Sequence, residues 1–102
     1  MKLLTSKIRL ALPALYLTEN EKDPIVQVKF FAPWTNCTWF ATEFDGQDIF
    51  FGLVIGLCEP ELGYFSLADL ESVTGPGGLR IERDLYFSPV PLSIVRAEGR
   101  AA

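Results

Sequence analysis

The stretch from Ile49 to Cys58, IFFGLVIGLC, most constrains the fold because it contains ten consecutive residues without a charge. It is too short to span a bilayer, which requires about 20 apolar residues in a helix. Its β-branched and aromatic residues, together with Gly52 and Gly56, are unfavourable in a core helix. The stretch therefore predicts a long central β-strand that is covered on both faces.

Short turn signals join this stretch to its neighbours and predict an antiparallel meander of four to five strands. Asp45-Gly46-Gln47 is a hairpin signal that leads into the central strand. In the first strand, alternation predicts that Val26, Val28 and Phe30 face one core. The predicted strands cover, in chain order, Ile25–Ala32, Cys37–Phe44, the central stretch, Tyr64–Phe65 and Leu79–Phe87.

Two or three short helices are predicted beside this sheet, and the whole forms a single α+β domain over residues 1–96. Thr5 or Ser6 can cap a first helix, which Pro13 ends. Ser66 is predicted to cap a second helix, with Asp69 as its capping-box partner. The predicted helices end near Leu12, Val73 and Arg96, with Leu67, Leu70 and Val73 facing the core and residues 97–102 forming a disordered tail.

The composition favours a compact protein without a common catalytic pattern. Hydrophobic residues make up 49% of the chain, enough for a core without disulfides or metal, and there is no histidine. Histidine is the commonest general base and metal ligand, so the chain lacks the residue that most often serves in either role. No catalytic residue, cofactor or metal site is predicted. A small enzyme is the least supported alternative, and it would use the hairpin carboxylates Glu43, Asp45 and Asp48 or the pair Glu82 and Asp84.

The two cysteines are too few for a disulfide framework and lack metal-ligand spacing. In a two-residue hairpin, Cys37 lies opposite Val54, about four residues from Cys58 along the strand, which exceeds disulfide reach. The same register places Trp39 opposite Gly52, so that the indole covers the glycine. We therefore predict two free thiols in a reducing cytosol.

The N-terminus and the charge pattern favour a cytoplasmic protein that binds neither a membrane nor duplex DNA. The first apolar run is interrupted by Lys7, Arg9 and Pro13, unlike the core of a signal peptide. The net charge is −4 and the nine basic residues are scattered, so a basic stripe for phosphates is absent. The glycine-rich segment Gly75–Gly78 lacks the lysine and the following helix of a phosphate-binding loop.

Two groups of residues are candidates for binding a partner. Phe31, Trp34 and Trp39 can share a sheet face that the helices leave bare, and tryptophan is enriched at interface hot spots. Packing on the sheet is the favoured alternative for these aromatics. The second group forms either a charge-protected edge strand, which we favour, or an Arg–carboxylate cluster that docks a partner. Its members are Arg80, Glu82, Arg83 and Asp84.

Several motifs together resemble the domain-of-unknown-function family 2958. They are FFGLVIG over Phe50–Gly56, ELGYFSL over Glu61–Leu67 and IERDL over Ile81–Leu85. The resemblance covers the chain from Met1 to about Leu92. It implies a small bacterial protein, often carried on plasmids and other mobile elements. It transfers no catalytic residue, because the family has no established activity.

These observations lead to the hypothesis of a non-enzymatic interaction protein of a mobile element, which binds another protein and blunts a host restriction or CRISPR system. The alternative is a domain that binds a small ligand or a single-stranded nucleic acid by stacking on aromatic side chains. The lack of a basic groove weakens the nucleic-acid alternative. An unpaired last strand or a bare aromatic face would each also support a homodimer.

Overall fold

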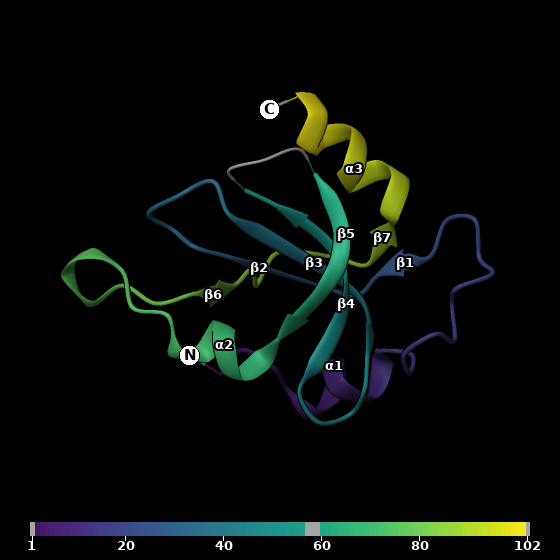
Figure 1. The fold of residues 1–102 in the computed structure, drawn as a ribbon, viewed down its shortest axis with the longest axis horizontal. Coiled ribbons are helices and arrows are strands. Elements are labelled where there is room, and N and C mark those ends of the chain that lie inside the picture. The colour runs from purple at the N-terminus through teal and green to yellow at the C-terminus, as the bar shows by residue number, and fades with distance from the viewer. Residues whose placement is uncertain (1, 57–59, 102) are drawn as a thin grey trace.

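The computed structural model describes residues 2–56 and 60–101, which form an α+β fold (Figure 1). Five strands make one antiparallel sheet in the order β5-β4-β3-β2-β6, and β1 pairs with β7 in a second, two-stranded sheet. The strands are β1 (Ile25–Val26), β2 (Val28–Phe31), β3 (Thr38–Phe44), β4 (Ile49–Ile55), β5 (Glu61–Ser66), β6 (Glu82–Arg83) and β7 (Val90–Pro91). The helices are α1 (Ser6–Ala11), α2 (Leu67–Ser72) and α3 (Leu92–Ala101), with a 3₁₀ turn, η1, over Pro76–Gly78.

The fold class is confirmed, and its meander runs through β2, β3, β4 and β5, with β6 added on the outer side of β2. Figure 1 shows α1 and α2 on the opposite side of the sheet from α3. Each face of the sheet is therefore covered by helix, as the apolar central strand predicts.

The two predicted helix caps are confirmed. The Thr5 hydroxyl accepts a hydrogen bond from the Ile8 N–H at 3.2 Å, and the Ser66 hydroxyl accepts one from the Asp69 N–H at 3.2 Å. Each bond satisfies a backbone donor that a helix start leaves unpaired. Val73, which we expected in the core, is the C-terminal cap of α2 and is 38% exposed, because the helix ends one residue earlier.

The face toward α1 and α2 holds an aromatic core. Phe44, Phe50 and Phe65 come from three neighbouring strands and stack with ring centroids 4.5 Å and 5.2 Å apart, and Phe30 meets Phe50 edge-on at 5.4 Å. Full burial of one such ring stabilises the fold by about 1.5–3 kcal/mol. Leucines of the N-terminal segment and of α2 close this core from outside.

The face toward α3 holds a smaller core in which Phe40 and Leu53 pack against Leu92 and Val95. The helix predicted to end at Arg96 continues to Ala101. Its start is held by Asp23, whose carboxylate accepts the Ser93 N–H at 2.8 Å and the Ser93 hydroxyl at 2.7 Å. Within the described part of the chain, no helix is long and apolar enough to cross a membrane.

The strand predicted over Ile25–Ala32 is divided in two, and this corrects its core assignment. Val26 pairs with Val90 in the second sheet and packs in the core under α3. Val28 and Phe30 pack in the core on the other face. The break at Gln27 arises because β1 leaves the main sheet to pair with β7, so the alternation does not continue through it.

The hairpin between β3 and β4 is wider than the two-residue turn we predicted. Phe44 pairs with Phe50, and the Asp45 N–H donates to the Ile49 carbonyl at 2.9 Å. The Asp45 side chain stabilises the wider turn, because one carboxylate oxygen accepts three backbone N–H groups at 2.8–3.0 Å. The donors are those of Gln47, Asp48 and Ile49.

A β-bulge in β3 also shifts the register. Thr42 has no pairing partner in β4, so two residues of β3 take the place of one. Trp39 therefore pairs with Val54, and Ala41 rather than Trp39 lies opposite Gly52. The predicted role of Trp39 as a cover for this glycine is wrong because of the wider turn, which alone would place Thr42 opposite Gly52; the bulge then moves this pairing to Ala41.

The same shift changes the neighbour of Cys37. A Cβ atom added to Gly56 would lie 3.2 Å from the Cys37 Sγ, so the thiol faces Gly56 rather than Val54. Cys37 is a free, half-buried thiol. Cys58, the other half of the predicted pair of free thiols, lies outside the described residues.

Candidate functional site

The three aromatic residues predicted to share a bare sheet face do not do so. Trp39 pairs with Phe30 and, like Trp34, packs against the core under α1 and α2. Phe31 follows Phe30 in β2, so its side chain lies on the opposite face. All three are half-buried. The expectation fails because helices and the N-terminal segment cover both faces, and a partner-binding role for these residues stays a prediction.

The strand predicted over Leu79–Phe87 is shorter than expected, because only Glu82 and Arg83 pair with β2 as the edge strand β6. The charged side chains from Arg80 to Asp84 are directed to different neighbours. Arg80 donates to the Glu71 carbonyl of α2, and Arg83 donates to the Lys2 and Leu3 carbonyls, the latter at 3.0 Å. Asp84 lies 3.6 Å from the Lys29 ammonium. Arg80 and Glu82 also border a hollow of about 480 Å³ beside α2. These contacts link β6 to the rest of the fold.

The hairpin carboxylates are separated by their structural partners. Asp45 stabilises the turn, whereas Asp48 accepts the Ser66 hydroxyl at 2.7 Å and the Ala68 N–H at 2.8 Å at the start of α2. Within residues 2–56 and 60–101, no group of three or more acidic or cysteine side chains is placed to hold a metal ion. The arrangement therefore offers no paired carboxylates for acid–base chemistry at the hairpin.

Glu43 is the buried carboxylate of this region, with 4% of its surface exposed. Its Oε1 accepts the Tyr16 N–H at 2.9 Å, and its Oε2 accepts both the Thr18 N–H at 2.9 Å and the Thr18 hydroxyl. Burial raises the pKa of Glu43, but the hydrogen bonds from Thr18 and Tyr16 outweigh it and lower the pKa below its usual value. Glu43 is therefore ionised at neutral pH.

The turn that Glu43 holds is strained. Tyr16 has a φ of 69°, and it is the non-glycine residue with positive φ among the described residues. A bulky side chain in this region costs about 1–3 kcal/mol, and the conformation persists only where its surroundings impose it. The hydrogen bond from the Tyr16 N–H to Glu43 supplies that constraint. The Tyr16 ring is 61% exposed as a result.

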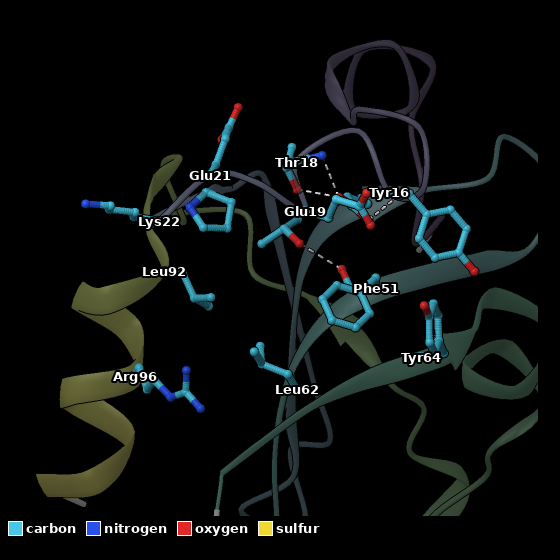
Figure 2. A pocket seen from close by; sticks show the side chains of 13 residues that line it. Tyr16, Thr18, Glu19, Glu21, Lys22, Phe51, Leu62, Tyr64, Leu92 and Arg96 are labelled. Carbon is cyan, nitrogen blue, oxygen red and sulfur yellow. Dashed lines mark hydrogen bonds between the residues drawn. The ribbon is translucent and has the colours of Figure 1, made fainter.

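A hollow of about 400 Å³ opens beside this turn, on the α3 face of the sheet (Figure 2). We call it the β5 hollow. Leu92 and Arg96 of α3 form one wall, and Leu62 and Tyr64 of β5 form the opposite one. The floor contains Glu43 and Phe51, and the loop from Tyr16 to Pro24 closes one end. The volume lies in the range of small-molecule sites, about 300–1,000 Å³.

The rim of the β5 hollow is aromatic and exposed. Tyr64 is 55% exposed and its ring lies 5.0 Å from that of Phe51, while Leu62 is 39% exposed. A hydrogen bond with the Tyr16 side chain raises the pKa of Tyr64, so its phenol is neutral at physiological pH. An amphipathic rim of this kind suits contact with a polypeptide, since tyrosine presents both apolar area and a polar end.

Arg96 contributes an unusual polar atom to the wall of the β5 hollow. Its Nε is buried and has no hydrogen-bond partner among the described residues. Figure 2 shows its guanidinium group extending from α3 toward Leu62, across the hollow. In the same view, the side chains of Glu21 and Lys22 point away from the hollow.

The strand β5 forms one edge of the sheet, and no described strand pairs with its outer side. The Leu67 N–H donates to the Asp48 carbonyl at 2.8 Å, so Leu67 and Asp48 are a hydrogen-bonded pair at the end of the β4–β5 ladder. Since hydrogen-bonded pairs alternate along an antiparallel ladder, the N–H and C=O groups of Leu62 and Tyr64 point outward. The same two residues line the hollow with their side chains.

Reasoning from the sequence missed Tyr16, Leu62, Tyr64 and Arg96. One signal was available for the region, because Glu43 is a charged residue inside an otherwise uncharged strand, TWFATEF. A carboxylate at such a position needs hydrogen-bond donors from elsewhere in the chain. The sequence does not reveal that those donors come from the turn at Tyr16.

Fold and site together define a small α+β protein whose antiparallel sheet ends in an open strand beside an amphipathic hollow. The family model described as "Protein of unknown function (DUF2958)" matches residues 3–102. The chain therefore belongs to this family, as the sequence motifs indicated. No curated protein and no solved structure matches the chain.

Proposed function

We propose that this protein is a non-enzymatic protein-interaction module that binds an extended segment of a partner along the outer edge of β5. The observation that carries the proposal is the open edge itself. Its outward N–H and C=O groups at Leu62 and Tyr64 accompany exposed side chains above the β5 hollow.

Strand addition uses two kinds of contact. Main-chain hydrogen bonds to an exposed sheet edge provide affinity, and alternate side chains of the added segment enter pockets and provide specificity. The outward groups at Leu62 and Tyr64 supply the first kind of contact. The β5 hollow lies directly beside them and supplies the second.

The proposal includes a setting. The protein acts in the bacterial cytoplasm as an accessory protein of a plasmid or other mobile element, and its partner belongs to a host restriction or CRISPR system. This part rests on the resemblance of the sequence motifs and on no contact in the fold. Identification of the partner tests it directly.

Site-specific photo-crosslinking in a bacterial host tests the binding surface. A photoreactive phenylalanine analogue is placed at Tyr64, at Trp34 or at Tyr86, which is 95% exposed beyond β6. We expect crosslinks to one protein from position 64 and none from position 86. Crosslinks from position 34 or 86, with none from position 64, would assign the partner to another surface.

A matched pair of substitutions separates the main-chain contact from the side-chain contact. Tyr64→Ala removes the ring but keeps the outward N–H, whereas Tyr64→Pro removes both and leaves the bonds to β4 intact. We expect Tyr64→Pro to weaken partner binding at least tenfold more than Tyr64→Ala, about 1.4 kcal/mol. Equal losses in two variants that fold alike by circular dichroism would exclude strand addition.

A second candidate function is the binding of a small molecule, which the volume of about 400 Å³ of the β5 hollow favours. Native mass spectrometry of the protein purified from its host would detect such a ligand as a defined added mass. A ligand that Leu62→Asp removes, in a protein without any protein partner, would replace the interaction proposal with this one.

A further inference from the structure

The buried Nε of Arg96 is unusual, because buried polar groups in folded proteins nearly always have a hydrogen-bond partner. An unpaired buried donor lowers the stability of the fold, and more so when it carries charge. Arg96 also follows Leu92 by one helical turn, and that side chain is buried under the sheet face. Arg96 as a whole is half-buried and lines the hollow, so the helix holds its side chain at the wall of the hollow while the Nε stays unpaired.

The carboxylates of the lining belong to Glu19, Glu21 and Glu43, and among the described residues none of them forms an ion pair with Arg96. Both oxygens of Glu43 are occupied by donors from Tyr16 and Thr18. Glu21 points away from the hollow (Figure 2). Among the described residues, Arg96 has no ion pair. The guanidinium group is thus presented to whatever enters the β5 hollow.

We infer that the β5 hollow binds a carboxylate carried on an apolar body, with the guanidinium group of Arg96 as its receptor. The inference rests on the proposed function, in which the carboxylate belongs to the segment added along β5. A guanidinium group forms paired, charge-assisted hydrogen bonds with a carboxylate, and these are about twice as strong as neutral ones. Leu62, Leu92 and Phe51 provide the apolar surface around it.

The carboxylate has two possible sources in a polypeptide, a C-terminus or an Asp or Glu side chain. Three small probes distinguish them: N-acetyl-leucine has a main-chain carboxylate, N-acetyl-glutamate α-amide has a side-chain carboxylate, and N-acetyl-leucinamide has none. Each probe is titrated into the ¹⁵N-labelled protein, and the Nε–Hε resonance of Arg96 is followed by NMR. The resonance is assigned by its loss in Arg96→Lys.

We expect a saturable shift of the Arg96 resonance with one of the two carboxylate probes and at least tenfold weaker binding of the amide. Arg96→Lys keeps a charge but loses the planar fork, and it should weaken carboxylate binding about tenfold. The matched control Arg9→Lys changes an arginine of α1 outside the hollow and should leave binding unchanged.

No saturable shift with either carboxylate, an amide that binds equally well, or an equal response to inorganic phosphate alone would overturn the inference. The proposed function is tested separately by Tyr64→Pro and Tyr64→Ala. If these variants behave as expected while the carboxylate probes fail, strand addition stands and the carboxylate receptor is wrong. If the probes bind while photo-crosslinking at Tyr64 fails, the hollow is a carboxylate site without strand addition.

Discussion

The two edges of the main sheet are built in opposite ways. The β6 edge consists of Glu82 and Arg83 alone, carries a charge on both, and is tied to the N-terminal segment through Arg83. The β5 edge extends over six residues, Glu61–Ser66, and Glu61 is its charged member. Open edges promote unwanted pairing unless a protein shortens, charges or covers them. The β6 edge is therefore protected by its short length and its charges, whereas the β5 edge is longer and has Glu61 as its charged member.

The space around a glycine near each edge also differs. Beside β6, the indole of Trp34 packs so closely on Gly75 that an added Cβ would lie 2.5 Å from the ring. Beside β5, a Cβ added to Gly63 would meet no atom within 4 Å. The β5 edge thus combines open space at Gly63 with the exposed side chains of Leu62 and Tyr64 beside the β5 hollow, which is the reason we propose partner binding at β5.

The largest effect is expected from Glu43→Gln. The amide keeps one acceptor oxygen for three donors and places an NH₂ group among them, so buried donors are left unpaired. We expect a loss of about 3 kcal/mol in the free energy of unfolding, measured by urea denaturation. The Tyr16 turn should also lose its hydrogen-exchange protection.

Glu61→Gln is the matched control, because Glu61 is exposed on β5. It should change the free energy of unfolding by less than about 0.5 kcal/mol. Similar losses in both variants would mean that Glu43 contributes only through net charge. The loop that closes one end of the β5 hollow would then not depend on the hydrogen bonds of the Glu43 carboxylate.

The second-largest effect is expected from replacing glycine by alanine, compared at Gly75 before β6 and at Gly63 in β5. Gly75→Ala forces the Trp34 ring away from its packing site and should cost about 2 kcal/mol. Gly63→Ala adds a methyl group in open space and restricts the unfolded chain, so it should be neutral or stabilise by about 0.5 kcal/mol. Thermal unfolding of the two variants measures the difference. Equal effects would contradict the contrast between a packed and an open edge.

Local features of this fold were predictable from the sequence because their signals lie within a few residues. The caps at Thr5 and Ser66 and the turn after Phe44 each follow from side chains that bond to nearby backbone. The central strand follows from an uncharged run that no helix would favour. The width of the turn after Phe44 and the bulge at Thr42 have no such signal, and the wider turn was enough to misplace Trp39.

The β5 hollow was not predictable because its parts meet only in the folded chain. The Tyr16 N–H and the Glu43 carboxylate are 27 residues apart, and the positive φ of Tyr16 depends on that contact. Arg96 reaches the hollow because α3 packs beside β4, whereas the sequence suggested only a short helical turn there. The sequence indicated instead the charged segment Arg80–Asp84 and the aromatic residues, of which Trp34 and Trp39 pack against the core.

Acid should affect the β5 side through carboxylates that have lowered pKa values. The pKa of Asp23 is lowered by its bonds from Ser93, and that of Glu43 by Thr18 and Tyr16 despite burial. The folded state then binds fewer protons than the unfolded state, so stability is present above the unfolded pKa values. It is lost as pH falls through the folded ones, between about pH 5 and pH 2.

Thermal unfolding followed from pH 7 to pH 3 measures this loss, and we expect the Tm to fall by several degrees in the wild type. Glu43→Gln removes one of the carboxylates whose pKa is lowered in the folded state, so its Tm should fall less over the same range. A steeper fall in Glu43→Gln would show that acid acts mainly at other carboxylates.

The smallest effect is expected at the protected edge, from Asp84→Asn. The amide oxygen can still accept the Tyr86 N–H, which Asp84 holds at 2.9 Å, so the substitution removes only the ion pair with Lys29. That pair is 3.6 Å long and its side chains are partly exposed, a setting in which ion pairs contribute less than about 1 kcal/mol. Urea denaturation should therefore detect a change of about 0.5 kcal/mol or less, smaller still in high salt. A loss above about 1.5 kcal/mol would show that charge pairing, and not the short strand and its main-chain contacts, closes the β6 edge.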